Sequence, residues 1–489
     1  MNYVFYDTES SGTSTRFDQV LQFAAVVTDE DFNEIDTLNV RCRLLPHVVP
    51  AVDALLVTGV NPYDLASQPL SAFEMACLVH EKMRTWGPAV YIGQNTLKFD
   101  EEILRETFYQ NLLDPYVTTA RGSIRADLLH ILRAAHTADP DVIQITTTEK
   151  GNPSFKLDRI ATLNGFPNHD AHDALGDVRA TIYMARLIRE RAPGTWGRMM
   201  SNADPKRAAE LIERNRLVSL LTYFGKPKLV EATRLAAQPG NPKQVALFDV
   251  SVDPTPWLDL EAEDIARAMG WKGPKAAPVD TSAESEDEVL PPRGAQGPSP
   301  FHIVRTNAMP CVFVPGEPGA PVSDGDALER DVLIRRLDRI HGHPRFKDTV
   351  AAALELRSAF PKSPHIEEQI YDGFPSNEDK NRMRAFHATR SWAERLEIAS
   401  GFQDIRLRKL GNRLIHANAP EVLPASLEAA ATRAMVNDRI LAQGKVPWTT
   451  LGAAKASLEG REDTAEIMEI RRWFAEFEEA VKARLEPVS

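Results

Sequence analysis

Short apolar runs alternate with polar turns along the N-terminal part of the chain. Such runs between turn-forming residues are typical of buried strands, and they predict strands at residues 3–6, 20–28, 38–45 and 89–93. Helical periodicity predicts helices at 71–86, 99–111, 125–138, 156–164 and from about 170 to 191, with caps at Ser71 and Ser154. Strands that give way to alternating helices and strands predict an α/β domain with a mixed sheet.

The pattern changes after residue 192. Strands are expected at 245–250, 301–304 and 311–314, and the pattern is helical from about residue 363 to the end, where 462–485 is long and amphipathic. Residues 273–300 are rich in Pro, Gly, Ser and Ala around an acidic core, which is typical of a mobile loop. We therefore expect three domains, at 1–192, 193–362 and 363–489.

The composition is that of an ordinary globular protein of 489 residues with a net charge of −12. Residues 1–192 hold 26 acidic and 17 basic side chains, so most of the excess negative charge lies there. No apolar run is long enough to cross a membrane. Cys42, Cys77 and Cys311 lie far apart without metal-ligand spacing, which favours reduced thiols and a cytoplasmic location.

Two carboxylates end the first predicted strand. Asp7 and Glu9 are two residues apart, so in a strand their side chains project to the same side. Two like charges side by side are costly unless a cation lies between them. The pair is therefore either half of an oxygen-ligand site for Mg²⁺ or Mn²⁺, or a strand that runs into a polar turn.

Two later segments add titratable groups at helix starts. Asp100 lies in the first turn of its predicted helix, where an acid often does no more than complement the helix dipole. His172 precedes the last helix of this domain, and Asp177 lies about one turn inside it. Five residues apart, His172 and Asp177 can both reach a site at that helix start, although a lone histidine there is more often a surface or capping residue.

Taken in order, these segments resemble the DEDDh family of 3′→5′ exonucleases, which have an RNase H-like fold. The three motifs are Asp7-x-Glu9, Asn95-x-x-x-Phe99-Asp100 and His172-x-x-x-x-Asp177. The likeness to bacterial exonuclease I is closer and extends thinly over nearly the whole chain. The segments that carry it include Gln22-Phe23-Ala24-Ala25, Phe99-Asp100-Glu101-Glu102, Asp114-Pro115-Tyr116, Pro153-Ser154-Phe155, residues 241–250 and Tyr371-Asp372-Gly373-Phe374.

The resemblance implies a two-metal site. Two Mg²⁺ ions, with Mn²⁺ as an alternative, would be held by Asp7, Glu9, Asp100 and Asp177. His172 would be the general base, since an imidazole pKa near neutrality suits that task. His169 is the rival candidate, but its spacing to Asp177 does not match the family motif.

The resemblance also implies contacts to a nucleic acid strand. By position, the residues expected to contact the strand are Thr8, Glu9, Arg105, Tyr116, Arg133 and Lys156. Tyr116 is suited to stack on a base and Arg105 to reach a phosphate. The family has tryptophans where this chain has Ala120 and Ala126, so we expect weaker stacking there.

The resemblance implies a magnesium-dependent exodeoxyribonuclease that degrades single-stranded DNA from its 3′ end to 5′-mononucleotides in DNA repair and recombination. It implies an SH3-like β-barrel at 193–362, an all-α C-terminal domain, a monomer, and docking of the acidic tail of single-stranded DNA-binding protein. The alternatives are an RNA exonuclease like RNase T or oligoribonuclease and a DNA-binding adaptor with a silent nuclease site. The basic run Arg406, Arg408, Lys409 and Arg413 is either a solvated helix face or a phosphate or acidic-peptide track.

Overall fold

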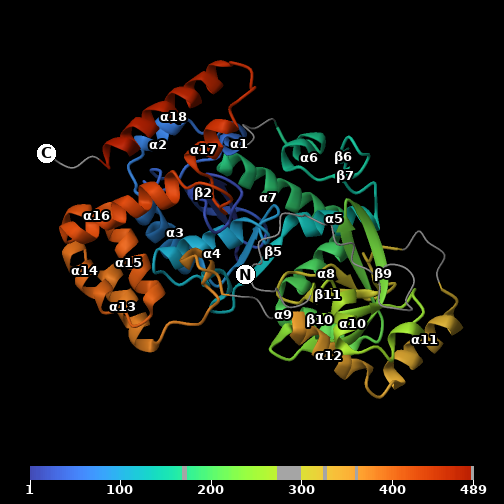
Figure 1. Ribbon diagram of the computed structural model, residues 1–489. Helices are drawn as coiled ribbons and strands as arrows, with labels where there is room; N and C mark the ends of the chain where they lie inside the picture. Colours follow the sequence, from blue (N-terminus) through green and yellow to red (C-terminus); the bar gives the residue numbers. More distant parts are fainter. Residues whose placement is uncertain (168–172, 273–298, 323–327, 358–361, 486–489) are drawn as a thin grey trace. The chain divides into compact units, whose positions relative to one another are not determined.

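The computed structural model describes residues 1–167, 173–272, 299–322, 328–357 and 362–485. The chain divides into two compact units, and Figure 1 traces it through both by colour. Unit 1 comprises residues 1–124, 168–182 and 362–489, and unit 2 comprises residues 125–167 and 183–361. The domains expected at 1–192, 193–362 and 363–489 stay a prediction. No helix among the described residues is long and apolar enough to cross a membrane.

A five-stranded mixed sheet forms the centre of unit 1, which confirms the expected α/β arrangement. Its strands are β1 (Tyr3–Ser10), β2 (Val20–Thr28), β3 (Glu34–Arg41), β4 (Val90–Gly93) and β5 (Ile124–Asp127), in the order β3-β2-β1-β4-β5. Strand β1 is antiparallel to β2 and parallel to β4. The strand expected at 38–45 lies further upstream, because β3 is an edge strand with a polar, exposed face and the apolar pattern alone misplaced it.

Helices connect the strands of this sheet and follow the last of them. They are α1 (Val52–Thr58), α2 (Pro62–Ala66), α3 (Ala72–Trp86), α4 (Asp100–Gln110) and the first half of α7 (Ala174–Arg191). Ser71 caps α3 in a capping box with Glu74, as the sequence predicts for the helix start. A side chain at Gly93 would lie 2.0 Å from Thr96 Oγ1 and 2.5 Å from the carbonyl oxygen of Tyr6, so only glycine lets β4 end this close to β1.

The C-terminal part of unit 1 is helical, as expected. It comprises η3 (Ile366–Glu368), α13 (Asn377–Ala388), α14 (Trp392–Ser400), α15 (Ile405–Asn418), η4 (Pro420–Val422), α16 (Ala425–Arg433), η5 (Ala434–Ile440), α17 (Leu451–Ala456) and α18 (Ala465–Ala483). Figure 1 shows α13–α16 gathered in orange. Phe386, Phe402 and Leu410 of this group share a buried cluster with Tyr109 and Leu112 at the end of α4. The helical end of the chain is therefore packed directly against a helix that begins with Asp100.

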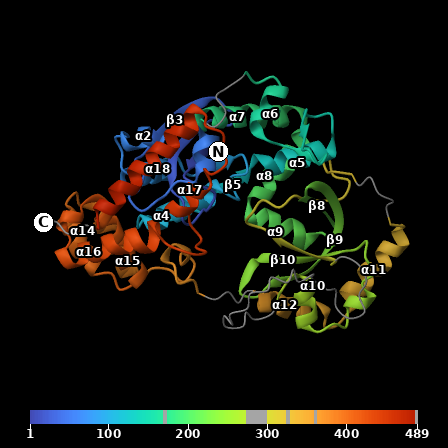
Figure 2. The same ribbon diagram turned by 45° about the horizontal axis from the view of Figure 1, so that its top comes forward.

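Unit 2 contains an antiparallel sheet, of which Figure 2 labels β8, β9 and β10 in green. Its strands are β8 (Val218–Phe224), β9 (Lys226–Gln238), β10 (Asn241–Asp249), β11 (Phe301–Arg305) and β12 (Val312–Phe313), in the order β11-β10-β9-β8-β12. The sequence prediction included β10, β11 and β12 but not β8 and β9. Most of the loop expected at 273–300 lies outside the described residues. Whether the sheet forms an SH3-like barrel stays a prediction.

The helices of unit 2 correct two predicted boundaries. They are α5 (Leu128–Ala138), α6 (Leu157–Leu163), the second half of α7, α8 (Pro193–Ala203), α9 (Pro205–Arg214), α10 (Ala262–Ala268), α11 (Arg330–Gly342) and α12 (Phe346–Arg357), with a short hairpin of β6 (Thr146–Thr147) and β7 (Pro153–Ser154) and the turn η2 (Thr255–Trp257). The helix expected from residue 125 begins at Leu128, because Asp127 accepts a hydrogen bond from the Leu129 N–H at 2.9 Å and caps it. At α6 the cap position belongs to Lys156 and not to Ser154.

Candidate active site

Three acidic side chains from two separate parts of unit 1 converge at one point. Asp7 and Glu9 project from the end of β1, and Asp177 lies in the first turn of α7. One carboxylate oxygen from each lies within 4.8 Å of the others, a spacing at which they could hold one metal ion. The sequence predicted both that the side chains of Asp7 and Glu9 project to the same side of a strand and that Asp177 lies near the start of a helix. The structure supplies the fact that the two elements meet.

Asp100 lies next to this group, and the backbone between the other two acids fixes its orientation. Its Oδ1 accepts hydrogen bonds from the Thr8 N–H at 3.0 Å and from the Thr8 hydroxyl at 2.6 Å. The first turn of α4 is therefore tied to β1 between Asp7 and Glu9. Thr8, expected to contact the strand, is buried, and its N–H and hydroxyl donate hydrogen bonds to Asp100.

The carboxylates of this group disfavour one another's ionisation. Burial, followed by the charges of Asp100, Glu9 and Asp177, raises the pKa of Asp7 well above its ordinary value. Burial, followed by Asp177 and Asp100, raises the pKa of Glu9 to about 8, and the Arg41 charge counteracts this shift. Such a cluster of buried and half-buried carboxylate oxygens fits a hard divalent cation such as Mg²⁺ or Mn²⁺, whose charge would offset the repulsion.

The expected general base cannot be placed. His172 and its rival His169 lie outside the described residues. Asp173, the residue after His172, lies directly before α7. Its Oδ1 accepts a hydrogen bond from Gln22 Nε2 at 3.0 Å and lies 3.5 Å from Arg41 Nη2. Asp173 also raises the pKa values of Asp7 and Glu9, so it borders the carboxylate group.

Arg105, expected to reach a phosphate, is engaged within the protein. It is 8% exposed, and its Nη2 donates to Glu101 at 2.6 Å. Its Nη1 donates to the hydroxyl of Tyr371 at 3.1 Å, and its guanidinium lies 5.4 Å from the ring centroid of Tyr116. The side chain is therefore held between an acid of its own helix and two aromatic rings.

Those rings form an aromatic group with Phe374, of which the sequence analysis assigned only the half-buried Tyr116 to base stacking. Phe374 is 80% exposed and Tyr371 is 54% exposed, and the ring centroids of Phe374 and Tyr116 are 6.2 Å apart. Arg406 of α15 holds the loop at residues 369–373, because it donates hydrogen bonds to the carbonyl oxygens of Gln369 at 2.5 Å and of Gly373 at 2.9 Å. The only sequence signal was the segment 371–374, quoted for its likeness to exonuclease I.

The remaining two expected contacts belong to unit 2. The guanidinium of Arg133 lies 4.6 Å from the ring centroid of Tyr223, which in turn contacts Phe155 edge to face. The Arg133 Nε is buried without a hydrogen-bond partner among the described residues. Lys156 is exposed at the start of α6. Both side chains stay candidates for contacts to a phosphate backbone.

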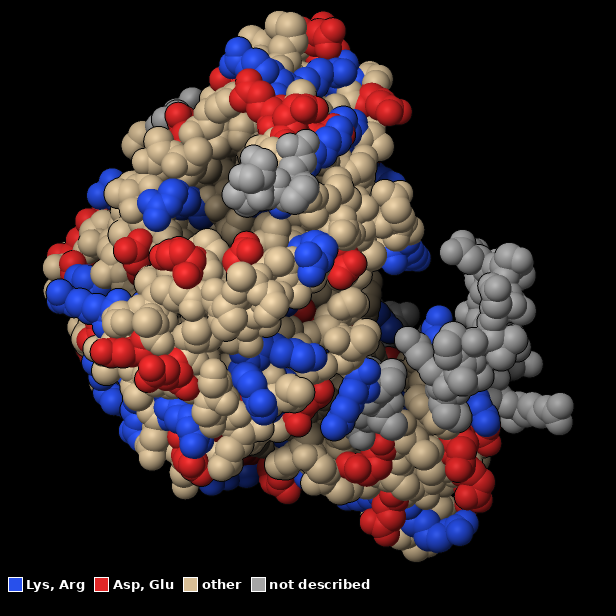
Figure 3. Space-filling view, turned by 60° about the vertical axis from the view of Figure 1, so that its left-hand side comes forward, with Lys and Arg blue, Asp and Glu red and all other residues tan. Residues whose placement is uncertain are grey.

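The basic run near residue 410 splits into two kinds of residue. Arg408 and Lys409 are exposed, whereas Arg406 holds the 369–373 loop and Arg413 donates to Glu367 at 2.8 Å. On the face drawn in Figure 3, basic and acidic side chains are interspersed and form no large basic area. Half of the run is therefore accessible, so that a solvated face and a phosphate or acidic-peptide track both stay open for it, and the other half has a structural role.

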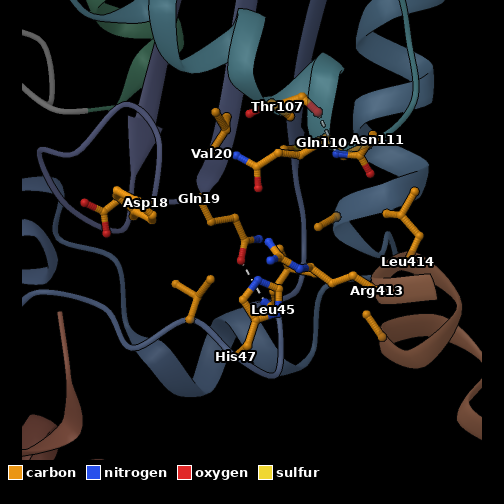
Figure 4. A pocket seen from close by; sticks show the side chains of 15 residues that line it. Asp18, Gln19, Val20, Leu45, His47, Thr107, Gln110, Asn111, Arg413 and Leu414 are labelled. Atoms are coloured by element: carbon orange, nitrogen blue, oxygen red, sulfur yellow. Dashed lines mark hydrogen bonds between the residues drawn. The ribbon is translucent and has the colours of Figure 1, made fainter. Parts of the chain in front are cut away.

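A pocket of about 50 Å³ in unit 1 involves none of the four acids. Figure 4 shows Gln19, His47 and Arg413 around it, with the Gln19 side chain accepting a hydrogen bond from the Leu45 N–H at 2.7 Å. Burial, followed by the charges of Arg413 and Arg439, lowers the pKa of His47 well below its ordinary value. The His47 side chain in this pocket therefore favours its neutral form, and the pocket is not a second site of clustered acids.

Two family models match the chain. The Exonuclease model matches residues 4–185, and the Exonuclease I C-terminal domain model matches residues 364–470. Among curated proteins, the chain is 28% identical over 418 residues to exodeoxyribonuclease I of Haemophilus influenzae, covering 84% of each chain. It is 27% identical over 389 residues to exodeoxyribonuclease I of Escherichia coli, covering 78% of each.

Solved structures give the same answer for the fold. A moderately thermophilic exonuclease I from Methylocaldum szegediense superposes with a TM-score of 0.82 at 27% identity, covering 99% of this chain and 100% of that one. Exonuclease I of Escherichia coli in complex with a dA16 oligonucleotide superposes with a TM-score of 0.81 at 23% identity, covering 98% and 99%. The likeness therefore extends over both units and includes the region where the sequence resemblance is thin.

Proposed function

The chain belongs to the exonuclease I family, and we propose on this basis that it hydrolyses single-stranded DNA in the 3′→5′ direction and releases 5′-mononucleotides. The relatives with which it shares most of its length are exodeoxyribonucleases, and one of them has been solved with a single-stranded oligonucleotide. The observation that carries the proposal is the group of Asp7, Glu9 and Asp177 within 4.8 Å, with Asp100 beside it.

In this proposal the four acids hold divalent metal ions, two Mg²⁺ ions or Mn²⁺ in their place. When bound, such ions neutralise charge on the phosphodiester and activate the attacking water. The protein's own contribution is to hold the carboxylates close together in a buried site. Thr8 keeps Asp100 turned toward β1 through its N–H and hydroxyl. His172 is proposed as the base that takes the proton of the water, on the basis of its motif spacing to Asp177.

The DNA strand needs contacts that hold it single-stranded and lead its 3′ end to the acids. In unit 1, we assign base stacking to the exposed ring of Phe374 and to the half-buried ring of Tyr116 beside it, because every base has a face on which an aromatic ring can stack. The bonds of Arg105 to Glu101 and Tyr371 make it a residue that fixes this surface. In unit 2, Arg133 and Lys156 are proposed to contact the phosphate backbone of the DNA.

Family membership also supports the wider proposals. These are action in DNA repair and recombination, a cytoplasmic monomer, an SH3-like domain built on the β8–β12 sheet, and docking of the acidic tail of single-stranded DNA-binding protein. The exposed Arg408 and Lys409 of α15 are suited to meet an acidic peptide.

Digestion of 5′-labelled single-stranded DNA and RNA of equal sequence tests the proposal. With Mg²⁺ we expect the DNA alone to shorten from its 3′ end to mononucleotides, and with EDTA we expect no cleavage. Faster shortening of the RNA would replace this proposal with an RNA exonuclease. Binding without cleavage of either strand would indicate an adaptor with a silent site.

A further inference from the structure

A row of polar side chains leads from the carboxylate group to the edge of the sheet. Glu9 of β1 lies opposite Gln22 of β2, and Gln22 lies opposite Arg41 of β3. Residues directly opposite one another on neighbouring strands project from the same face of a sheet. Glu9, Gln22 and Arg41 therefore share a face.

Gln22 is the centre of this row and is out of place by composition. The β2 segment VLQFAAVVT is buried throughout, and Gln22 is 1% exposed. A buried amide is costly unless its hydrogen bonds are made. Here they are: Nε2 donates to Asn39 Oδ1 at 2.9 Å and to Asp173 Oδ1 at 3.0 Å, and Oε1 accepts from Arg41 Nη2 at 3.0 Å. The sheet thus holds one oxygen of Asp173 through an amide, with a guanidinium beside it.

Asp173 lies one helical turn before a member of the carboxylate group. It directly precedes α7, and its carbonyl oxygen accepts a hydrogen bond from the Asp177 N–H at 3.1 Å. The position of the first turn of α7 determines whether the Asp177 carboxylate reaches Asp7 and Glu9. Fixing Asp173 to β2 and β3 fixes that turn.

We propose that Gln22 and Arg41 are positioning residues of the active site. They hold Asp173, and with it the first turn of α7, where Asp177 closes the carboxylate group with Asp7 and Glu9. Neither residue needs to touch the substrate for this role. Outer contacts of this kind keep ligands in place, and their loss typically reduces metal affinity or activity by about 10–100-fold.

The chain offers a matched control. Arg179, on the same helix α7, lies 3.6 Å from Glu34 of the same strand β3, and both side chains are about half exposed. This ion pair joins the same two elements as Arg41 and Asp173, but without the buried amide. A general loss of helix-to-strand contact would affect both sites, whereas a positioning role affects only Gln22 and Arg41.

The test compares Gln22→Met, which keeps the size of the side chain and removes its hydrogen bonds, with Arg41→Ala and Arg179→Ala. Mn²⁺ affinity without DNA is measured by titration calorimetry, and kcat and KM are measured on single-stranded DNA. We expect Gln22→Met and Arg41→Ala each to lose about tenfold in Mn²⁺ affinity and in kcat, with KM nearly unchanged. Arg41→Lys should recover part of the loss, and Arg179→Ala should behave as the wild type.

Wild-type Mn²⁺ affinity and kcat in both Gln22→Met and Arg41→Ala would overturn the inference, and so would an equal loss in Arg179→Ala. If Gln22→Met does not fold, Arg41→Ala decides alone, since its side chain is 39% exposed. The kinetic part rests on the proposed function, but the Mn²⁺ titration does not. A wild-type protein that binds Mn²⁺ and degrades no DNA would refute the function and leave the positioning test intact.

Discussion

Two buried glutamates in unit 1 have opposite surroundings. Glu9 is 8% exposed and Glu367 is 2% exposed. Burial, with Asp177 and Asp100 as the next causes, raises the pKa of Glu9 to about 8. Burial also favours the neutral form of Glu367, but Arg413 at 2.8 Å and Arg439 at 3.1 Å outweigh it, and the net pKa of Glu367 is lowered.

The difference shows where the protein supplies its own counter-charge. Glu367 is paired within the fold, and Arg439 is further enclosed by Phe17 and Trp448, at 5.0 and 4.2 Å from their ring centroids. This is a structural ion pair. Around Glu9 the neighbours are mostly acids, so the fold supplies little counter-charge of its own, and a bound cation would offset the repulsion. Burial alone therefore does not identify a functional acid, but the sign of its neighbours does.

The largest effect is expected at the uncompensated site. Asp7→Asn removes one charge and one strong ligand, and we expect the rate of DNA hydrolysis to fall by about a thousandfold or more, since such ligands contribute several kcal/mol. In EDTA the same variant should unfold at a higher temperature than the wild type, because it relieves repulsion. Glu81→Gln, at an exposed acid of α3 paired with Arg84, is the control and should change neither quantity. Retained hydrolysis in Asp7→Asn would contradict the assignment of the four acids.

The reverse pattern is expected at the compensated site. Glu367→Gln leaves Arg413 and Arg439 without their buried partner and should lower the free energy of unfolding by about 3–5 kcal/mol, with kcat of the folded enzyme unchanged. The measurement is urea unfolding followed by circular dichroism. Glu378→Gln, which breaks the more exposed pair with Arg382, should cost no more than about 1 kcal/mol. A large loss of kcat in Glu367→Gln would mean that this pair also serves the reaction.

The two sites should also respond differently to pH. An acid whose folded-state pKa lies above its ordinary value of 4.5 holds its proton when folded and loses it when unfolded, so stability falls as pH rises from about 4.5 to about 8. Glu367, with its lowered pKa, contributes stability above pH 4.5 and loses that contribution only in more acidic solution. In EDTA we therefore expect the melting temperature to fall between pH 5.5 and 8.5. With Mg²⁺ in place of EDTA, we expect the melting temperature to rise, and to rise more at pH 8.5 than at pH 5.5. Glu9→Gln should make the melting temperature in EDTA depend less on pH. An unchanged dependence would contradict the assignment of this effect to Glu9.

For the carboxylate group, the sequence predicted the features that depend on neighbouring residues in the chain. The alternation of β1 puts Asp7 and Glu9 on one side, and helix-start signals put Asp100 and Asp177 in first turns. These are short-range rules. The role of Arg105 as a phosphate contact stays a prediction, and its bond to Tyr371, 266 residues away, is not visible from the sequence.

Two further features depend on partners that are distant in the sequence. Gln22 is a polar residue in an apolar strand, and its partner Asp173 is 151 positions away. The long strand β9 begins at Lys226-Pro227-Lys228, with three exposed residues that local propensity does not assign to a strand. Pairing with β8 and β10 decides its structure, and pairing is not visible in one sequence.

The smallest effect is expected at the aromatic group of Tyr116, Tyr371 and Phe374, where the charge of Arg105 is paired with Glu101. Phe374→Ala should raise KM for single-stranded DNA by about fivefold and leave kcat unchanged, since stacking contributes about 1–3 kcal/mol per base. Phe374→Tyr should keep the wild-type KM, because it keeps the ring. Ile405→Ala, which removes an apolar side chain that is 60% exposed on α15, is the control for a general loss of apolar surface. An equal rise of KM in Ile405→Ala, or a fall in kcat in Phe374→Ala, would contradict the stacking role. The expected split of KM from kcat would show that compensated charges, such as that of Arg105, support the surface that binds DNA, while the uncompensated acids carry the chemistry.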